Sequence, residues 1–576
     1  MPPASNSRLR VALVTTPPSV RSGIGDYTRH LLPYLREHVD VELYVQHGAD
    51  EAAWGDERAR LVDELVPNHF DQVLFQLGNE AHHGFMALMV RAIGGTVMQH
   101  DWVLFDLATA AYPGLVRGGA KGHALALREG GFEQARTYCA NWSARRNGRR
   151  RPEPIGDPDA LPGVILAGWH EYESHGGRWT SDAAAVRIPA KGVREVSFDV
   201  HLEGARTASL ALRPEAVDGA HVAEGTTTLK LDGADRPVVW LRTAGITVTR
   251  EQREHGDCRR LGSFVKRVNW RDAKGVHELD LAEPSARPIR PVDLSRDRFL
   301  LPLNRSIVRF ADAFIVHSEY VRRRILLERN AVTKTGLVQH GAERRWHDEP
   351  RAATRARMGL PTDWHDGFVV TSFGGVQKHK RIEEALRALE LARRTDPSIR
   401  MVLAGNVVAV DFDPRATARA LGLEDAVHFT GFVSEEEAWD WLHAGDVALN
   451  LRGPSSGGTS GGIFQAFSLG RFVLASDGAE QRELPDDVAV KIPLGADEVP
   501  VLAERLLQLA SDPAERARRE EAVRRYVDEH CHWSLMAAKY ADHLSGFPRP
   551  DVGVKRLAKM RIALEALRRR ELVRSR

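Results

Sequence analysis

The chain has 576 residues, of which 43% are hydrophobic and 27% are charged; this is ordinary for a globular protein and excludes a disordered chain. Its 80 Lys and Arg residues nearly balance 78 Asp and Glu residues, so no overall field attracts nucleic acid, which we exclude as a main partner. The length exceeds what one hydrophobic core organises and predicts several domains.

The N-terminal region predicts an α/β domain. A buried-strand pattern at 8–16 leads into a loop with Gly23 and Gly25, and a helical pattern follows at 27–38. The alternation continues with the helical segment 81–93 and with three strand patterns, at 39–45, 70–78 and 94–100. Strands that alternate with helices predict a mainly parallel sheet.

From about Gly168 the helical periodicity disappears, and short alternating segments separated by turns follow. We interpret this region as an antiparallel β-sandwich of roughly seven to nine strands. The α/β pattern resumes after Pro291. The sandwich is therefore predicted to be an insertion within the first α/β domain.

A second α/β series starts near Gly367, and two doubly wound domains of this kind bind their ligand at the carboxyl ends of the strands. The expected fold class is α/β, with two Rossmann-like domains and an all-β sandwich inserted in the first. The expected domains are the first part of the N-terminal domain at 1–167, the sandwich at 168–290, the second part of the N-terminal domain at 291–345, the C-terminal donor-binding domain at 346–545 and a basic amphipathic helical tail at 546–576.

Two glycine-containing loops are candidate phosphate sites. Gly23 and Gly25 lie between a strand and a helix, where backbone amides can approach an anion, although a plain tight turn is an equal alternative. The segment 455–462 separates an apolar strand from an apolar helix and is the stronger candidate. We expect diphosphate to bind to donors from this segment, with a flexible surface loop as the alternative; the donors are Thr459, Ser460, Gly461 and Gly462.

A basic segment at 374–381 precedes a predicted helix and contains Gly375, Gln377 and Lys380. A cation at a helix start is unfavourable unless an anion binds there, so we expect Lys380 to neutralise a pyrophosphate leaving group. The alternative is a solvated basic helix start. His100 closes a predicted strand at the binding edge, which favours a functional role over a structural one, and His82 and His83 follow the neighbouring strand.

The three cysteines have neither zinc-ligand spacing nor a disulfide framework. A reducing cytoplasm is therefore expected. No His, Cys or carboxylate cluster has metal-ligand spacing either, so we expect no metal site and no cofactor other than the substrate. The short apolar run at 11–14 is too brief for a signal-peptide core, and no stretch approaches about 18 apolar residues. We expect neither secretion by that route nor a membrane span.

Seven segments of the two α/β regions, taken in their order along the chain, resemble the GT-B superfamily and specifically the family-4 retaining glycosyltransferases. The resemblance covers about four-fifths of the chain, in both α/β domains, and rests on seven segments: 18–35, 76–85, 98–107, 310–324, 372–382, 427–462 and 464–477. It implies a nucleotide-sugar donor bound mainly by the second domain, an acceptor bound mainly by the first, and retention of configuration without a required metal.

The resemblance also assigns roles. It implies that Gly23 and Gly25 form the N-terminal phosphate-side loop, that His100 lies near the donor sugar, and that Lys380 binds the diphosphate. The chain departs from the family at three positions. The usual pair of glutamates falls on Gly457 and Gln465, and the usual arginine before the lysine falls on Gly375. Gln465 can still hydrogen-bond a ribose hydroxyl group, but it lacks the carboxylate charge.

Two regions have open interpretations. The sandwich loosely resembles β-rich modules of bacterial cell-surface sugar enzymes, and its tryptophans either stack on sugar rings or belong to its core. The tail from Asp551 onward is basic and amphipathic. It either contacts an anionic membrane surface, which would make the protein peripheral at the inner face of the membrane, or packs against the first domain.

The predicted function is retaining transfer of a sugar from a nucleoside-diphosphate sugar to a saccharide or lipid-linked saccharide, in cell-surface polysaccharide biosynthesis. The alternative is a non-catalytic protein that binds nucleotide sugar or glycan and has lost the glutamate pair. A GT-B sugar epimerase ranks below both, because the strand ends carry too few carboxylates for an acid/base pair.

Overall fold

The computed structural model describes residues 8–17, 20, 22–47, 58–146, 165–173, 176–188, 190–202, 206–212, 220–222, 225–235, 237–246, 261–279, 281, 298–329, 333–407 and 413–574. These residues form two compact units. The larger unit comprises 1–143, 292–492 and 505–576, and the smaller comprises 144–291 with 493–504. The predicted domain boundaries remain predictions.

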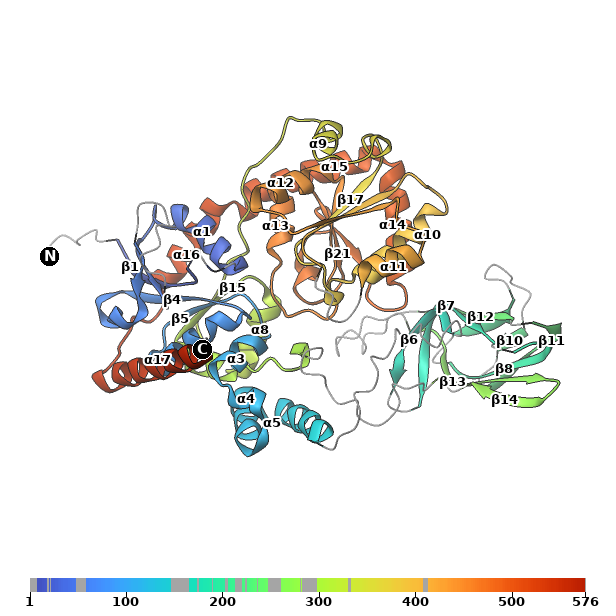
Figure 1. The fold of residues 1–576 in the computed structure, drawn as a ribbon, viewed down its shortest axis with the longest axis horizontal. Helices are drawn as coiled ribbons and strands as arrows, with labels where there is room; N and C mark the ends of the chain where they lie inside the picture. The colour runs from blue at the N-terminus through green and yellow to red at the C-terminus, as the bar shows by residue number, and fades with distance from the viewer. Residues whose placement is uncertain are drawn as a thin grey trace. The chain divides into compact units, whose positions relative to one another are not determined.

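The larger unit contains two parallel sheets, which confirms the expectation of two Rossmann-like domains (Figure 1). The first sheet has the order β16-β15-β5-β4-β1-β2-β3, and every neighbouring pair is parallel. Its strands are β1 (Arg10–Val14), β2 (Asp40–Val45), β3 (Arg60–Leu61), β4 (Gln72–Leu77), β5 (Thr96–Gln99), β15 (Ala313–Val316) and β16 (Thr335–Leu337). The central strands β4, β5 and β15 are buried along their whole length, as expected when helices cover both faces.

Helices accompany this sheet, beginning with α1 (Gly23–Leu35) and α2 (Gly84–Ile93). Both are expected from the apolar periodicity, whereas the sequence predicts no helix at α3 (Phe105–Ala111), α4 (Gly114–Arg117) or α5 (Gly119–Arg146). After the insertion, α7 (Arg305–Phe310) precedes β15 and α8 (Glu319–Glu328) connects β15 to β16, the last two strands of this sheet. The α/β pattern therefore resumes in the same sheet, since β15 pairs with β5.

The second sheet has the order β19-β18-β17-β20-β21-β22, again with parallel pairs throughout. Its strands are β17 (Val369–Phe373), β18 (Arg400–Ala404), β19 (Val427–Gly431), β20 (Val447–Asn450), β21 (Val473–Ser476) and β22 (Ala489–Ile492). Its helices are α9 (Arg351–Arg357), α10 (Ile382–Arg393), α11 (Pro414–Ala420), α12 (Glu435–Ala444), α13 (Gly461–Ser468), α14 (Glu498–Ser511) and α15 (Pro513–Tyr526). Strands β17, β20 and β21 are central and end at one edge, where the predicted donor residues follow them.

The smaller unit contains the predicted β-rich insertion. Its nine described strands pair antiparallel in one hydrogen-bonded sheet, so a sandwich of two separate sheets is not confirmed. Alternate residues of β8 are buried, as a sheet with one apolar face requires. The strands are β6 (Ile165–Glu173), β7 (Gly177–Arg187), β8 (Val193–His201), β9 (Thr207–Ala211), β10 (Ala220–Val222), β11 (Gly225–Ala234), β12 (Val238–Ala244), β13 (Phe264–Asp272) and β14 (Gly275–Leu279).

The final two helices pack with the first parallel sheet. α16 (Trp533–Ser545) contributes Trp533 and Tyr540 to its core, although the predicted boundary places these residues in the C-terminal domain. α17 (Val554–Arg574) buries Met560 and Leu564 against the same domain. This is the packed arrangement that the sequence left open, and it buries part of the apolar surface of the tail, while Val554 and Ile562 stay exposed.

Candidate functional site

Lys380 lies at the carboxyl edge of the second sheet, in a short 3-10 turn after β17 (η8, Lys378–Lys380). Its Nζ donates a hydrogen bond to the carbonyl oxygen of Phe373 at 3.3 Å. Nζ also lies 2.7 Å from the point where a side chain on Gly374 would begin, and Gly374 has φ of +95°. Glycine at this position therefore lets the ammonium group fold back over the strand end.

Arg452 lies beside Lys380 and was not identified from the sequence. It lies two residues after the end of β20, and its Nη2 donates a hydrogen bond to Oγ of Ser460 at 3.1 Å. Burial lowers the pKa of Lys380 well below its ordinary value, and the positive charge of Arg452 lowers it further. Burial also lowers the pKa of Arg452 to about 10, although Glu480 and Asp101 oppose this. Among the described residues, neither cation forms an ion pair within 4.0 Å.

The first turn of α13 faces the same edge. Ser460 is its N-cap residue but makes no capping hydrogen bond, because its Oγ instead accepts from Asn450 and Arg452. The amide groups at the start of α13, including those of Gly461 and Gly462, are therefore left without the usual side-chain cap. Uncapped amides and two unpaired cations together favour an anion such as a diphosphate.

The remaining predicted donor residues surround this group. Gln377 precedes the 3-10 turn, with Nε2 3.2 Å from the position of a side chain on Gly375. Thr459 precedes the N-cap residue of α13 and is half-buried, as is Gln465 on the helix itself. Their roles in donor binding remain predictions.

The loop 455–458 has no space for a side chain at the position where the resemblance implies the first glutamate. A side chain on Gly457, which has φ of +74°, would begin 2.7 Å from Cβ of Trp102 and 3.0 Å from Cε1 of Tyr320. On Gly458 it would begin 2.0 Å from Oδ1 of Asp101. Real Cβ atoms do not approach other atoms so closely, so this loop conformation excludes any larger residue at either position.

His100 is held from both sides at the edge of the first sheet. Its Nε2 lies 2.7 Å from Oε1 of Gln76, and its Nδ1 lies 3.1 Å from Nε2 of His317. Tyr27 contacts its ring edge-on at a centroid distance of 4.7 Å. Burial lowers the pKa of His100 well below its ordinary value, so it acts as a neutral hydrogen-bonding group and not as a cation. Its predicted contact with the donor sugar remains a prediction.

Gly23 and Gly25 form the first turn of α1 and not a separate loop before it. Oγ of Ser22 accepts from the amide of Gly25 at 3.2 Å, so this capping bond already occupies one predicted phosphate donor. Gly23 is exposed, and open space adjoins it. The phosphate-side role therefore stays a prediction, and only Gly23 has the free approach that it requires.

Spacing did not indicate that Glu80, His82 and His83 form a cluster. Their nitrogen and oxygen atoms lie within 4.8 Å of one another, a distance at which such groups can hold a metal ion. These atoms already have protein contacts: Oε2 of Glu80 accepts from Ser22, and Nε2 of His83 lies 2.6 Å from Oγ1 of Thr16. A metal ion could bind here only if Glu80 and His83 gave up these contacts with Ser22 and Thr16. The absence of a metal site remains a prediction.

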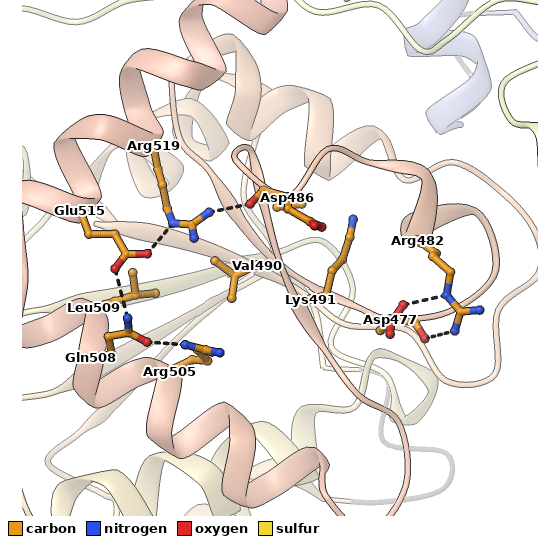
Figure 2. Close-up of a pocket in the computed structure, with 11 residues that line it drawn as sticks. Asp477, Arg482, Asp486, Val490, Lys491, Arg505, Gln508, Leu509, Glu515 and Arg519 are labelled. Carbon is orange, nitrogen blue, oxygen red and sulfur yellow. Dashed lines mark hydrogen bonds and ion pairs between the residues drawn. The ribbon is translucent and has the colours of Figure 1, made fainter. Parts of the chain in front are cut away.

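Figure 2 shows a separate pocket of about 590 Å³ on the C-terminal domain. Its charged groups contact one another: Arg482 pairs with Asp477 at 2.7 Å, and Arg519 pairs with Glu515 at 2.9 Å. Lys491 also lines the pocket and donates to two backbone carbonyl oxygens. None of the predicted donor residues lines this pocket, so we do not assign it to the donor.

A search of the described helices found none that is both long and apolar enough to cross a membrane.

Comparisons with known proteins identify the C-terminal α/β domain. Residues 367–512 match the model of the family described as glycosyl transferases, group 1. The expected resemblance is thereby confirmed for the part of the chain that carries Lys380, Arg452 and the start of α13.

Two curated relatives are glycosyl-transferring enzymes. The chain is 28% identical to D-inositol 3-phosphate glycosyltransferase of Streptomyces avermitilis over 279 residues, 46% of this chain and 55% of that protein. It is 27% identical to mannosylfructose-phosphate synthase of Agrobacterium fabrum over 162 residues, 24% of this chain and 34% of that protein. The chain thus spans about half or less of the length of these relatives.

Two solved structures are also similar. Sucrose-phosphate synthase from Thermosynechococcus elongatus is 20% identical, with a TM-score of 0.36 over 44% of this chain and 63% of that one. Staphylococcus aureus TarM, solved in complex with UDP, is 10% identical, with a TM-score of 0.42 over 93% of this chain and 99% of that one.

Proposed function

We propose that this chain, whose residues 367–512 belong to the glycosyl transferases group 1, transfers a sugar from a nucleoside-diphosphate sugar to a saccharide or lipid-linked saccharide. The observation that carries the proposal is the pair of unpaired cations, Lys380 and Arg452, beside the uncapped first turn of α13. Neither cation forms an ion pair within 4.0 Å among the described residues, although Glu480 and Asp101 interact with Arg452 at longer range, and a bound diphosphate would stabilise both.

In this reaction the diphosphate gains negative charge as the bond to the sugar breaks. Lys380 and Arg452 stabilise that charge, and amide groups at the start of α13 donate further hydrogen bonds to it. The site is pre-organised, because Arg452 is already held by Ser460. Gln465 holds the ribose, and neutral His100 orients the transferred sugar. The resemblance to family-4 enzymes implies front-face attack, in which the donor phosphate helps to accept the proton of the acceptor.

Isothermal titration calorimetry with UDP, GDP and ADP tests the site. We expect one of these nucleotides to bind the wild type and to bind Lys380→Ala and Arg452→Ala at least about tenfold more weakly, because each substitution removes a charge-assisted contact. Lys378→Ala is the matched control, since Lys378 is an exposed cation in the same 3-10 turn. Equal affinities for Lys380→Ala and Lys378→Ala would show that the nucleotide binds elsewhere.

A non-catalytic nucleotide-sugar-binding protein is the second candidate. It is favoured by the glycine at 457 and the amide at 465, where the resemblance implies carboxylates. Turnover separates the two candidates: an enzyme releases nucleoside diphosphate from its donor in the presence of an oligosaccharide or lipid-linked acceptor, whereas a binding protein leaves the donor intact.

We further propose that the protein works in the cytoplasm, with any membrane contact peripheral. Cys139 and Cys531 are free thiols, in keeping with a reducing compartment. Since α17 buries Met560 and Leu564, membrane contact would rest on its exposed basic side chains and on the exposed apolar residues Val554 and Ile562. Co-sedimentation with anionic vesicles in low salt and in high salt tests this contact.

A further inference from the structure

Glu480 is a buried carboxyl group at the same edge of the second sheet as the two cations. It lies in a 3-10 turn (η9, Ala479–Glu483) that begins three residues after the end of β21, and the residue is only 5% exposed. Its Oε2 accepts a hydrogen bond from Oγ of Ser455 at 2.7 Å. Within the described part of the chain, the buried Oε1 has no hydrogen-bond partner.

The backbone around Glu480 is strained. Ala479 has φ of +46°, a left-handed conformation that residues other than glycine rarely adopt. Strain of this kind persists where the surrounding structure imposes it, and it is concentrated at functional sites. Here it introduces a turn that buries the following carboxyl group beside Arg452, whose charge interacts with it.

The chemistry of this oxygen restricts what it can bind. An unpartnered carboxylate oxygen requires a hydrogen-bond donor, because leaving it buried and unsatisfied costs free energy. Phosphate oxygens are anionic acceptors and would be repelled, whereas a sugar hydroxyl group is a neutral donor. In a nucleotide sugar, the sugar is covalently attached to the diphosphate, so its hydroxyl groups lie near the cations that hold the phosphates.

The first family glutamate cannot supply this contact, since the loop leaves no space for a side chain on Gly457. Other carboxylates of the same turn region are already engaged. Asp477 pairs with Arg482 at 2.7 Å, and Glu483 accepts the backbone amide groups of Glu319 and Tyr320. Among these three carboxyl groups, Glu480 is therefore the one with a buried oxygen that has no hydrogen-bond partner.

We propose that Glu480 hydrogen-bonds a hydroxyl group of the transferred sugar and thereby selects nucleotide sugar over free nucleotide. This proposal rests on the proposed function and adds a residue that distinguishes a nucleotide sugar from a nucleoside diphosphate without a sugar. Burial raises the pKa of Glu480 to about 7, and the hydrogen bond from Ser455 and the charge of Arg452 oppose this.

The test compares Glu480→Gln with the wild type in two calorimetric titrations, one with UDP, GDP or ADP and one with the corresponding nucleotide glucose. Glutamine has the same size but removes the charge. We expect it to weaken nucleotide-glucose binding about tenfold and to leave nucleoside-diphosphate binding within twofold. Glu483→Gln is the matched control from the same turn, and it should leave the ratio of the two affinities unchanged.

The outcomes separate the two proposals. If the wild type binds none of the nucleotides, the proposed function is wrong. If the wild type binds nucleotide but Glu480→Gln weakens both ligands equally, or neither, the sugar contact is wrong and Glu480 acts only on the fold of the site. Circular dichroism and thermal melting show whether Glu480→Gln is folded. Glu480→Asp, which keeps the charge on a shorter side chain, is expected to retain more selectivity than Glu480→Gln.

Discussion

The hydroxyl group of Ser456 donates a hydrogen bond of 2.8 Å to Oδ1 of Asp101, although 355 positions separate the two residues. The carbonyl oxygen of Ser456 also accepts from the amide groups of Trp102 and Val103. The glycine-rich loop of the second α/β domain is thereby attached to the strand end that carries His100. This contact gives the loop its conformation and decides which side chains it can carry.

Restoring the family glutamate should therefore harm the protein. Gly457→Glu introduces a side chain at positive φ, 2.7 Å from Trp102. Overpacking of this kind costs about 1–3 kcal/mol, so we expect a melting temperature lower by several degrees and weaker nucleotide binding. Differential scanning calorimetry measures the first effect and titration the second. A variant with wild-type stability and higher turnover would show that the loop accommodates the carboxylate.

The rate of sugar transfer should depend on Lys380 far more than on Lys378, the other lysine of the same 3-10 turn. Lys380→Ala is expected to lower kcat by about 10- to 100-fold, because a charge-assisted contact to the leaving group contributes about 1.5–3 kcal/mol. Lys378→Ala, which removes an exposed cation, should lie within about twofold of the wild type. Turnover at saturating donor is the relevant measurement. Similar kcat values for the two variants would remove Lys380 from the reaction.

The contact between α1 and α12 should make stability depend on pH. Burial would lower the pKa of His30, but the hydrogen bonds that its ring nitrogens donate to Glu343 and Glu435 raise it to about 9. Because the folded pKa is above the ordinary value of 6.5, the contribution of charged His30 is complete below about pH 6.5 and is lost as the pH rises through about 9. Thermal melts between pH 6 and pH 10 should show this loss in the wild type.

His30→Gln is the control for this pH dependence. Its melting temperature should be lower than that of the wild type near pH 6 and should approach the wild-type value near pH 10. Parallel curves for the two proteins over this range would show that His30 does not titrate in the way that its contacts indicate.

Nucleotide binding should not require the β-rich insertion. Replacing 165–281 by a short Gly/Ser linker is expected to leave the affinity for nucleoside diphosphate within about threefold of the wild type. The reason is that Lys380, Arg452 and the start of α13 all belong to the larger compact unit. Far-ultraviolet circular dichroism must first show a folded protein. Loss of nucleotide binding by a folded variant would place part of the donor site in the insertion.

Much of the fold follows from local pattern. The buried strands and the helices between them are readable from apolar periodicity, and α1 begins at the Gly-containing segment because Ser22 caps it. The same local reasoning located Lys380 and the start of α13, since both lie where a strand ends and a helix begins. Helices α3 to α5 were missed, and the pairing of nine β strands in one sheet was not predicted, because pairing between strands is not a property of any single segment.

The sequence by itself determined the α/β class, the strand ends and the candidate donor residues, because each depends on neighbours within a few positions. Only the tertiary structure decided that Arg452 lies beside Lys380 with no ion pair within 4.0 Å among the described residues, and that Glu480 is buried with one oxygen unsatisfied. It also decided that Gly457 has no space for a side chain, because Trp102 and Tyr320, which are distant in sequence, pack against it. Charge and space at this site are set by such long-range contacts.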